Sequence, residues 1–192
     1  MPDGAFDAVV VAGGRGSRMG GLRKPELTLG GRRLVDVALA AVAGAGRRVV
    51  VGDVEVPAGV LRTREDPPYG GPVAAVDAGM ALLGADHAPW TVLLAGDLPD
   101  AEAAVACLVD ATAGPDDDGL CLLDGDGRLQ WLLGVYRTPA LLARLADRGD
   151  PPLSAMHRLL SPLRLRGVDP SDARVDDVDT PEDAARWGIA LP

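Results

Sequence analysis

The chain has 192 residues and a formal net charge of −9 at neutral pH. Apolar residues make up 47% of it, which excludes disorder of the whole chain and suits one α/β domain over residues 1–192. The negative charge argues against a surface for nucleic acid or anionic lipid, which must be basic, and no apolar run approaches the roughly 18 residues of a membrane span.

Along the chain, apolar β-branched runs alternate with stretches rich in Ala and Leu. The runs predict strands at residues 7–12, 48–51, 60–64, 90–95, 119–123, 129–136 and 163–168. The stretches predict helices at residues 34–43, 72–83, 101–113, 138–147 and 153–160. Strands that are apolar throughout and separated by helices indicate a mainly parallel sheet covered on both faces.

The amino terminus and the cysteines indicate the cellular environment. Residues 1–4 lack the basic start of a signal peptide, and no long apolar stretch follows them. Cys107 and Cys121 lie in apolar runs without CxxC or Cys/His spacing. We therefore expect a cytoplasmic protein with two reduced thiols.

The first predicted strand runs into a glycine-rich loop, defined here as residues 12–24. It reads Ala12-Gly13-Gly14-Arg15-Gly16-Ser17-Arg18-Met19-Gly20-Gly21-Leu22-Arg23-Lys24. Its glycines allow a ligand to approach the backbone closely, exposed N–H groups in such a loop cradle phosphate oxygens, and its four basic residues stand in a stretch without acidic ones. The spacing matches neither the P-loop nor the dinucleotide fingerprint. The loop predicts a triphosphate site.

Two aspartates lie beside predicted strand or helix ends, and the first is a candidate metal ligand. Asp97 directly follows the strand predicted at residues 90–95, where ligands bind in parallel sheets, and Mg²⁺ prefers oxygen ligands. Near the carboxyl terminus, Thr180 is expected to cap a helix that begins at Pro181. This cap leaves Asp179, the residue just before it, without an assigned structural role.

These motifs resemble those of the molybdenum cofactor guanylyltransferases, in the MobA-like NTP transferase family. The similarity is carried by Val11-Ala12-Gly13-Gly14, Arg18-Met19-Gly20-Gly21, Arg23-Lys24, Asp97-Leu98-Pro99 and Asp179-Thr180-Pro181-Glu182-Asp183. It implies an α/β fold, a Rossmann-like three-layer sandwich with a mainly parallel sheet, of the GT-A-like nucleotide-diphospho-sugar-transferase type. It also implies transfer of GMP from GTP to the phosphate of molybdopterin, with Mg²⁺ as cofactor and pyrophosphate as the second product.

The resemblance implies a role for individual residues. Lys24, Arg18 and Asp97 would be catalytic, and Asp97 and Asp179 would hold the metal. The nucleotide would be bound by Val11, Ala12, Gly13, Gly14, Arg15, Gly16, Lys24, Asp66, Gly71 and Asp97. Because the acceptor phosphate is already ionised, no side-chain base is needed, and catalysis would rest on positioning and electrostatics.

The sequence also departs from the family pattern. Arg23 replaces an aspartate before the lysine, Gly52 stands where an asparagine is frequent, and Trp131 replaces the proline of a Gln-Pro-Leu element near the acceptor site. Cytidylyl transfer to molybdopterin, transfer to another phosphorylated small molecule, and a non-catalytic nucleotide-binding module remain alternatives. Other proteins of molybdenum cofactor biosynthesis, or proteins that accept the cofactor, are further possible partners.

Overall fold

The fold is built on one seven-stranded sheet. A computed structural model describes residues 5–14, 19–111, 113–147, 149, 155–170, 173–176, 178–189 and 191. The strands lie in the order β5-β4-β1-β6-β8-β7-β9. Their bounds are Phe6–Val11 (β1), Arg48–Val51 (β4), Leu61–Thr63 (β5), Trp90–Ala95 (β6), Gly119–Leu123 (β7), Leu129–Arg137 (β8) and Leu165–Val168 (β9).

Most neighbouring strands run parallel, as predicted. β1 pairs in parallel with both β4 and β6, β4 pairs in parallel with β5, and β7 pairs in parallel with β9. β8 is the exception, because it is antiparallel to both of its neighbours, β6 and β7. The predicted mainly parallel α/β fold is confirmed.

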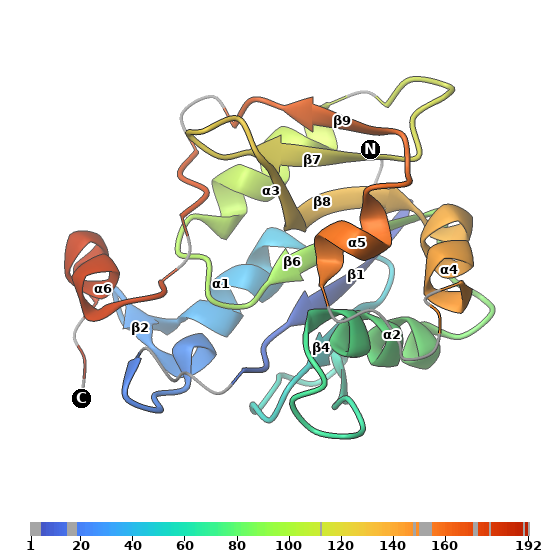
Figure 1. Cartoon of the computed structure of the whole chain (residues 1–192). Coiled ribbons are helices and arrows are strands. Elements are labelled where there is room, and N and C mark those ends of the chain that lie inside the picture. Colours follow the sequence, from blue (N-terminus) through green and yellow to red (C-terminus); the bar gives the residue numbers. More distant parts are fainter. Residues whose placement is uncertain are drawn as a thin grey trace.

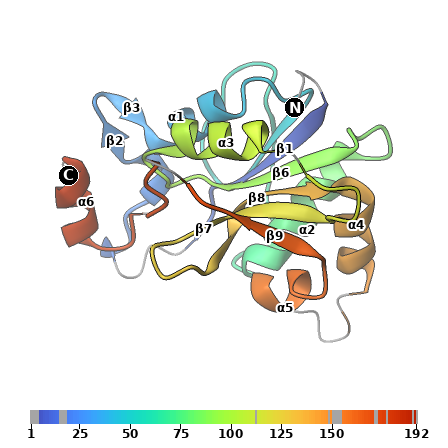
Figure 2. The ribbon, with the colours of Figure 1, turned by 90° about the horizontal axis from the view of Figure 1, so that it is seen from above.

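Helices cover both faces of this sheet, so the molecule has three layers (Figures 1 and 2). One face carries α1 (Leu34–Ala41) and α3 (Ala101–Asp110), and the other carries α2 (Pro72–Leu83), α4 (Thr138–Ala146) and α5 (Met156–Leu160). Two separate hydrophobic clusters fill the layers. Phe6, Ala8 and Val10 of β1 belong to the first cluster and Val9 to the second. Alternate side chains of a strand point to opposite faces, which is why β1 is apolar almost throughout.

A third, smaller cluster joins the two ends of the chain. It contains Met19, Leu27, Leu34, Val178, Ala184 and Ile189. The first three come from the segment after β1, which holds the 3-10 turn η2 (Lys24–Glu26) and the short hairpin of β2 (Thr28–Leu29) and β3 (Arg32–Arg33). The last three come from α6 (Pro181–Trp187) and its flanks, which lie beside β2 in Figure 1. This packing brings the carboxyl-terminal segment next to Lys24.

Several element ends differ from the prediction. α1 ends at Ala41 and α3 at Asp110, each before the predicted end, and β9 begins at Leu165 instead of residue 163. Leu163 is held in a turn after α5, because its N–H donates to Leu160 O at 2.9 Å. The predicted start of α5, residues 153–154, lies outside the described residues. The two-residue strands β2 and β3 were not predicted, because they are too short to show a period.

The two cysteines and the apolar character of the helices are the remaining features about which the sequence makes a prediction. Cys107 and Cys121 form no disulfide in the described part of the chain, and burial raises the pKa of the Cys121 thiol to about 11. Within the same part, none of the helices combines the length and the apolar character that crossing a membrane requires.

Candidate active site

The candidate site lies where the parallel strands end at their carboxyl termini. Backbone hydrogen bonds continue past the strand ends: Ala12 N donates to Val51 O at 2.8 Å, and Gly96 N donates to Val11 O at 2.8 Å. The backbone segments that follow β1 and β4 are so close that a Cβ on Gly52 would clash with the carbonyl oxygen of Ala12. With this backbone, glycine is therefore required at position 52.

A large cavity of about 410 Å³ opens at this edge of the sheet. It is lined by Val11, Gly13, Gly14, Lys24, Glu65, Tyr69, Gly71, Pro72, Ala75, Ala95, Asp97, Leu132 and Asp179. Seven of the residues predicted from the sequence are in this set: Val11, Gly13, Gly14, Lys24, Gly71, Asp97 and Asp179. The structure thus collects, in one cavity, residues that are spread over most of the chain.

Lys24 is the centre of the charged group in this cavity. Its ammonium Nζ donates a hydrogen bond to Asp179 Oδ1 and lies 3.6 Å from Asp97 Oδ2. The Lys24 and Asp97 side chains are mostly buried, with 17% and 19% of their surfaces exposed. Solvent therefore screens this pair less than it screens an exposed ion pair. The three residues come from η2, from the loop after β6 and from the segment before α6.

The two carboxylates fit a divalent cation. Both already face one positive charge, the Lys24 ammonium, and carboxylate oxygens suit Mg²⁺. Among the described residues, no group of three or more His, Cys, Asp or Glu side chains is arranged as a metal site. A cation here would consequently be held by one or two carboxylates together with water and substrate phosphates, which is the usual coordination of Mg²⁺.

The cap of α6 positions Asp179. Asp183 Oδ2 accepts hydrogen bonds from the Thr180 hydroxyl at 2.8 Å, from Thr180 N at 2.9 Å and from Asp179 N at 3.2 Å. Asp183 N in turn donates to Thr180 Oγ1, which completes a capping box. The predicted role of Thr180 as the cap is confirmed. The cap thus holds the backbone N–H of Asp179, whose side chain accepts a hydrogen bond from Lys24.

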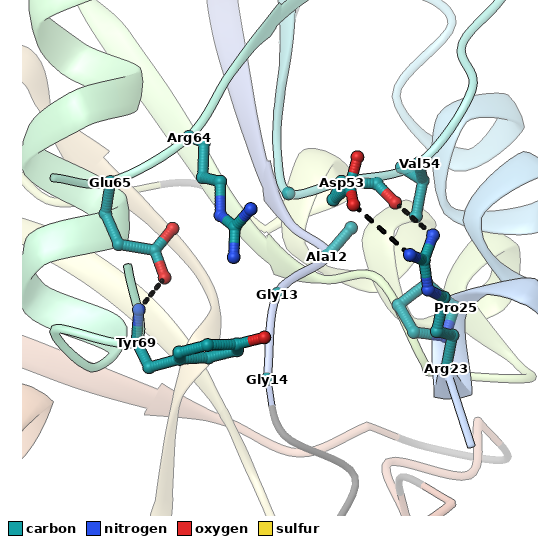
Figure 3. A pocket seen from close by; sticks show the side chains of 11 residues that line it. Ala12, Gly13, Gly14, Arg23, Pro25, Asp53, Val54, Arg64, Glu65 and Tyr69 are labelled. Atoms are coloured by element: carbon teal, nitrogen blue, oxygen red, sulfur yellow. Dashed lines mark hydrogen bonds and ion pairs between the residues drawn. The ribbon is translucent and has the colours of Figure 1, made fainter. Parts of the chain in front are cut away.

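A small cavity of about 80 Å³ adjoins the large one. The two share Gly13, Gly14, Glu65 and Tyr69 in their linings. In the part of the small cavity that the large one does not share, the Arg23 guanidinium donates to Asp53 O at 2.9 Å and to Asp53 Oδ2 at 3.2 Å (Figure 3). Arg23 and Gly52 both depart from the family pattern. Through the hydrogen bonds from Arg23 to Asp53, the neighbour of Gly52, they belong to the same wall of the small cavity.

The acid that lines both cavities is Glu65. Its side chain is buried, with 7% of the residue exposed, whereas the neighbouring Asp66, the predicted nucleotide ligand, is exposed and absent from both linings as far as the structure describes them. Adjacent residues of an extended chain point to opposite sides. Both acids follow the end of β5 at Thr63, and no local sequence pattern indicates which of them points inward.

The other predicted residues lie around these cavities or outside the described residues. Ala12 lines only the small cavity. Gln130 and Trp131 line a third cavity of about 230 Å³, which shares Ala95 and Leu132 with the large one. The Gln130 amide donates to Asp124 Oδ2 at 2.8 Å. Arg15, Gly16 and Arg18 lie outside the described residues.

Comparisons with known proteins identify the family and the fold. The model of the MobA-like NTP transferase domain matches residues 8–165. The bifunctional protein GlmU of Methylibium petroleiphilum is 36% identical over 157 residues, which cover 68% of this chain and 34% of that protein. The chain thus spans about a third of the length of this curated relative.

Solved structures show the same fold at low sequence identity. Molybdopterin-guanine dinucleotide biosynthesis protein A from Archaeoglobus fulgidus has a TM-score of 0.66 and 19% identity, with 95% of this chain and 96% of that chain covered. An inositol-1-phosphate CTP transferase from T. maritima has a TM-score of 0.68 and 14% identity, with 97% and 95% covered. The family model covers well over half of the chain, so this protein is a nucleotidyltransferase of the MobA-like NTP transferase family.

Proposed function

We propose that this protein transfers GMP from GTP to the phosphate of molybdopterin. An oxygen of the acceptor phosphate attacks the α-phosphorus of GTP, the bond between that phosphorus and the bridging oxygen to the β-phosphorus breaks, and pyrophosphate leaves. The observation that carries this proposal is the group of Lys24, Asp97 and Asp179 in the large cavity beside the glycine-rich loop. Support for the base and the acceptor comes from the motifs and from the Archaeoglobus fulgidus structure.

The chain's own residues act on charge and position. Attack by one anion on another is opposed electrostatically, so positive charge is needed at the α-phosphate and at the departing pyrophosphate. The Lys24 ammonium supplies such a charge from a mostly buried position, and we assign Arg18 to the same task from the sequence. From the sequence, we assign the backbone N–H groups of residues 13–16 to the β- and γ-phosphates. The acceptor phosphate is already ionised and requires no base.

Asp97 and Asp179 are the residues that would hold Mg²⁺, which when bound neutralises charge on the triphosphate. The same two carboxylates hold Lys24 in the structure. A cation and the lysine therefore compete for the same oxygens. With GTP bound, the Lys24 ammonium would contact a phosphate oxygen, while Asp97 and Asp179 would be available to hold the cation.

The acceptor has a place next to the nucleotide. The third cavity, lined in part by Gln130, Trp131 and Met156, adjoins the large one through Ala95 and Leu132. Trp131 provides an aromatic surface here, where the family pattern has proline, and aromatic surfaces bind flat rings by stacking. We assign the acceptor's ring system to this cavity and its phosphate to the boundary with the large one.

The test is release of pyrophosphate from each of the four NTPs, with and without molybdopterin and with and without Mg²⁺. The expected result is release that needs GTP, molybdopterin and Mg²⁺ together, and formation of a product with the mass of the guanine dinucleotide. Dependence on CTP would move the function to cytidylyl transfer, and dependence on a sugar phosphate would change the acceptor. Tight GTP binding without turnover would indicate a binding module.

A further inference from the structure

Glu65 is a buried carboxylate that is only half satisfied. Its Oε1 accepts a hydrogen bond from Tyr69 N at 3.0 Å. Its Oε2 is buried as well and accepts no hydrogen bond from any residue that the structure describes. A buried polar atom without a partner is costly in free energy. Such an atom in a binding cavity indicates that a ligand supplies the missing donor.

The position of the carboxylate shows from which side this donor comes. A Cβ built on Gly13 would lie 3.9 Å from each Glu65 carboxylate oxygen, so the carboxylate faces the first glycines of the loop. Glu65 lines both the small and the large cavity. In Figure 3 the carboxylate points toward the space between its own strand end and Gly13. A ligand that extends from the large cavity into the small one passes this acid.

Tyr69 forms the second part of the same site. It is one of two tyrosines in the chain, it is 52% exposed, and its backbone has a φ of 64°. This left-handed conformation is unfavourable for a bulky residue, and the hydrogen bond from its N–H to Glu65 helps to hold it. Figure 3 shows the ring extending from the Glu65 side toward Gly14. The ring thus presents a flat face at the boundary of the two cavities.

A planar group already lies on this face. The Arg64 guanidinium is 5.4 Å from the centre of the Tyr69 ring. Arg64 is exposed, and its flexible side chain can move away or cover a ligand from the other side. The Tyr69 face is therefore a surface for a planar ligand, and nucleotide bases stack on aromatic rings in this way.

We propose that Tyr69 is the platform for the nucleotide base and that Glu65 selects guanine by accepting its N1–H and 2-amino hydrogens. This inference rests on the proposed function, because it names the residues that would choose GTP. An ionised carboxylate only accepts hydrogen bonds. Guanine presents two donors side by side, whereas cytosine, adenine and uracil each place an acceptor next to a single donor on the corresponding edge. Only guanine satisfies both carboxylate oxygens without repulsion between lone pairs.

The test uses nucleotide binding to the full chain in the presence of Mg²⁺, with GTP, CTP, ITP and XTP as probes. ITP lacks the 2-amino group, and XTP has a carbonyl oxygen in its place. The wild type should bind GTP about tenfold or more tightly than ITP, because ITP loses a hydrogen bond to a charged group. It should also bind GTP more tightly than CTP and XTP.

Glu65→Gln is the decisive variant. Its amide still accepts from N1–H but now donates, so it should weaken GTP binding about tenfold or more and strengthen XTP binding by a similar factor. A role confined to the fold would not produce this exchange of preference. The thermal midpoint of each variant shows that it is folded, and the near-isosteric Gln should leave that midpoint close to the wild type.

Tyr69→Ala and Tyr69→Phe test the platform. Loss of the ring should weaken the binding of GTP, ITP and XTP alike, by about tenfold, whereas Tyr69→Phe keeps the ring and should bind them like the wild type. An unchanged GTP, ITP and XTP pattern in Glu65→Gln would overturn the selection by Glu65, and unchanged binding by Tyr69→Ala would overturn the platform.

These outcomes are distinct from a failure of the proposed function. Binding requires no acceptor, so an error in the acceptor leaves every result above unaffected. A wild type that prefers CTP, or that binds no nucleotide, would overturn the guanylyl assignment together with this inference. A wild-type preference for GTP that persists in Glu65→Gln would overturn the inference alone.

Discussion

Two buried carboxylates lie at opposite ends of the parallel strands, and their surroundings differ. At the amino ends, Asp7 of β1 is 2% exposed and accepts hydrogen bonds from Arg47 N at 2.9 Å, Ala88 N at 2.8 Å and the Arg47 guanidinium at 3.4 Å. At the carboxyl ends, Glu65 is 7% exposed and accepts one, from Tyr69 N, within the described part of the chain.

The comparison separates a structural use of a buried acid from a binding use. Arg47 precedes β4 and Ala88 precedes β6, so Asp7 ties together the starts of three neighbouring strands. Its oxygens are satisfied within the fold, as stability requires. Glu65 keeps an oxygen for a partner outside the fold. At the same carboxyl ends, Asp97 and Asp179 share the Lys24 ammonium, and we propose that they exchange it for a metal ion.

The largest expected effect is a loss of turnover on substitution of Asp97, at the carboxyl ends of the strands. Asp97→Asn removes a charge from the candidate metal site while it preserves the shape of the side chain. We expect turnover to fall by about two to three orders of magnitude, by analogy with the loss of one preorganised group that stabilises charge, with little change in the thermal midpoint. Pyrophosphate release measured over a Mg²⁺ titration checks this. Turnover near that of the wild type would remove Asp97 from the proposed mechanism.

Lys24→Ala should lower kcat by about two orders of magnitude, because a charge at the α-phosphate acts on the transition state. The matched control is Arg23→Ala, from the same loop. The Arg23 side chain is 57% exposed, against 17% for Lys24, and exposed charges are screened by salt. Arg23→Ala should raise KM in a salt-dependent manner and leave kcat almost unchanged. Equal, salt-sensitive changes in KM alone for both variants would show that Lys24 has no catalytic role.

A pair of near-isosteric variants compares the two ends directly. Asp7→Asn turns an NH₂ group toward N–H donors and leaves a buried donor unsatisfied, so it should lower the free energy of unfolding by about 1–3 kcal/mol. Glu65→Gln replaces a buried oxygen that has no protein donor, so it should not lower that free energy. Urea unfolding of both variants measures the difference. Similar losses of stability in both variants would contradict a structural role for Asp7 and a binding role for Glu65.

The smallest expected effect concerns the cap that positions Asp179. Thr180→Ala should cost about 1 kcal/mol of stability and reduce turnover moderately, because Asp179 loses its support. The Thr180 hydroxyl, as the main cause, holds the pKa of Asp183 below its ordinary value. A carboxyl with a lowered pKa in the folded state stabilises the protein above the unfolded pKa of about 3.9 and loses this contribution as the pH falls through the folded pKa.

The stability difference between the wild type and Thr180→Ala should therefore be complete at neutral pH and shrink below about pH 4. Unfolding at both pH values measures it. A difference that grows on acidification would show that the Asp183 carboxylate is not the acceptor on which the cap depends.

The sequence by itself determined the fold class, the glycine-rich loop and the helix cap. Each depends on local properties: the apolar runs of β1 and β6 need cover on both faces, the glycines of the loop permit close backbone approach, and Thr180 and Asp183 are near enough in the chain to satisfy one another. Chemistry that is contained in a few consecutive residues can be predicted without knowledge of the tertiary structure.

Only the tertiary structure decided which of these residues meet. Lys24 and Asp179 are 155 positions apart, and the packing of Leu27 and Leu34 with Val178 and Ala184 brings them together. In the segment after β5, the folded structure buries Glu65 and exposes Asp66. The close approach of Ala12 required glycine at position 52, and the adjacent Asp53 pairs with Arg23. Such choices depend on strand register and on contacts between distant segments, which no local pattern of the chain encodes.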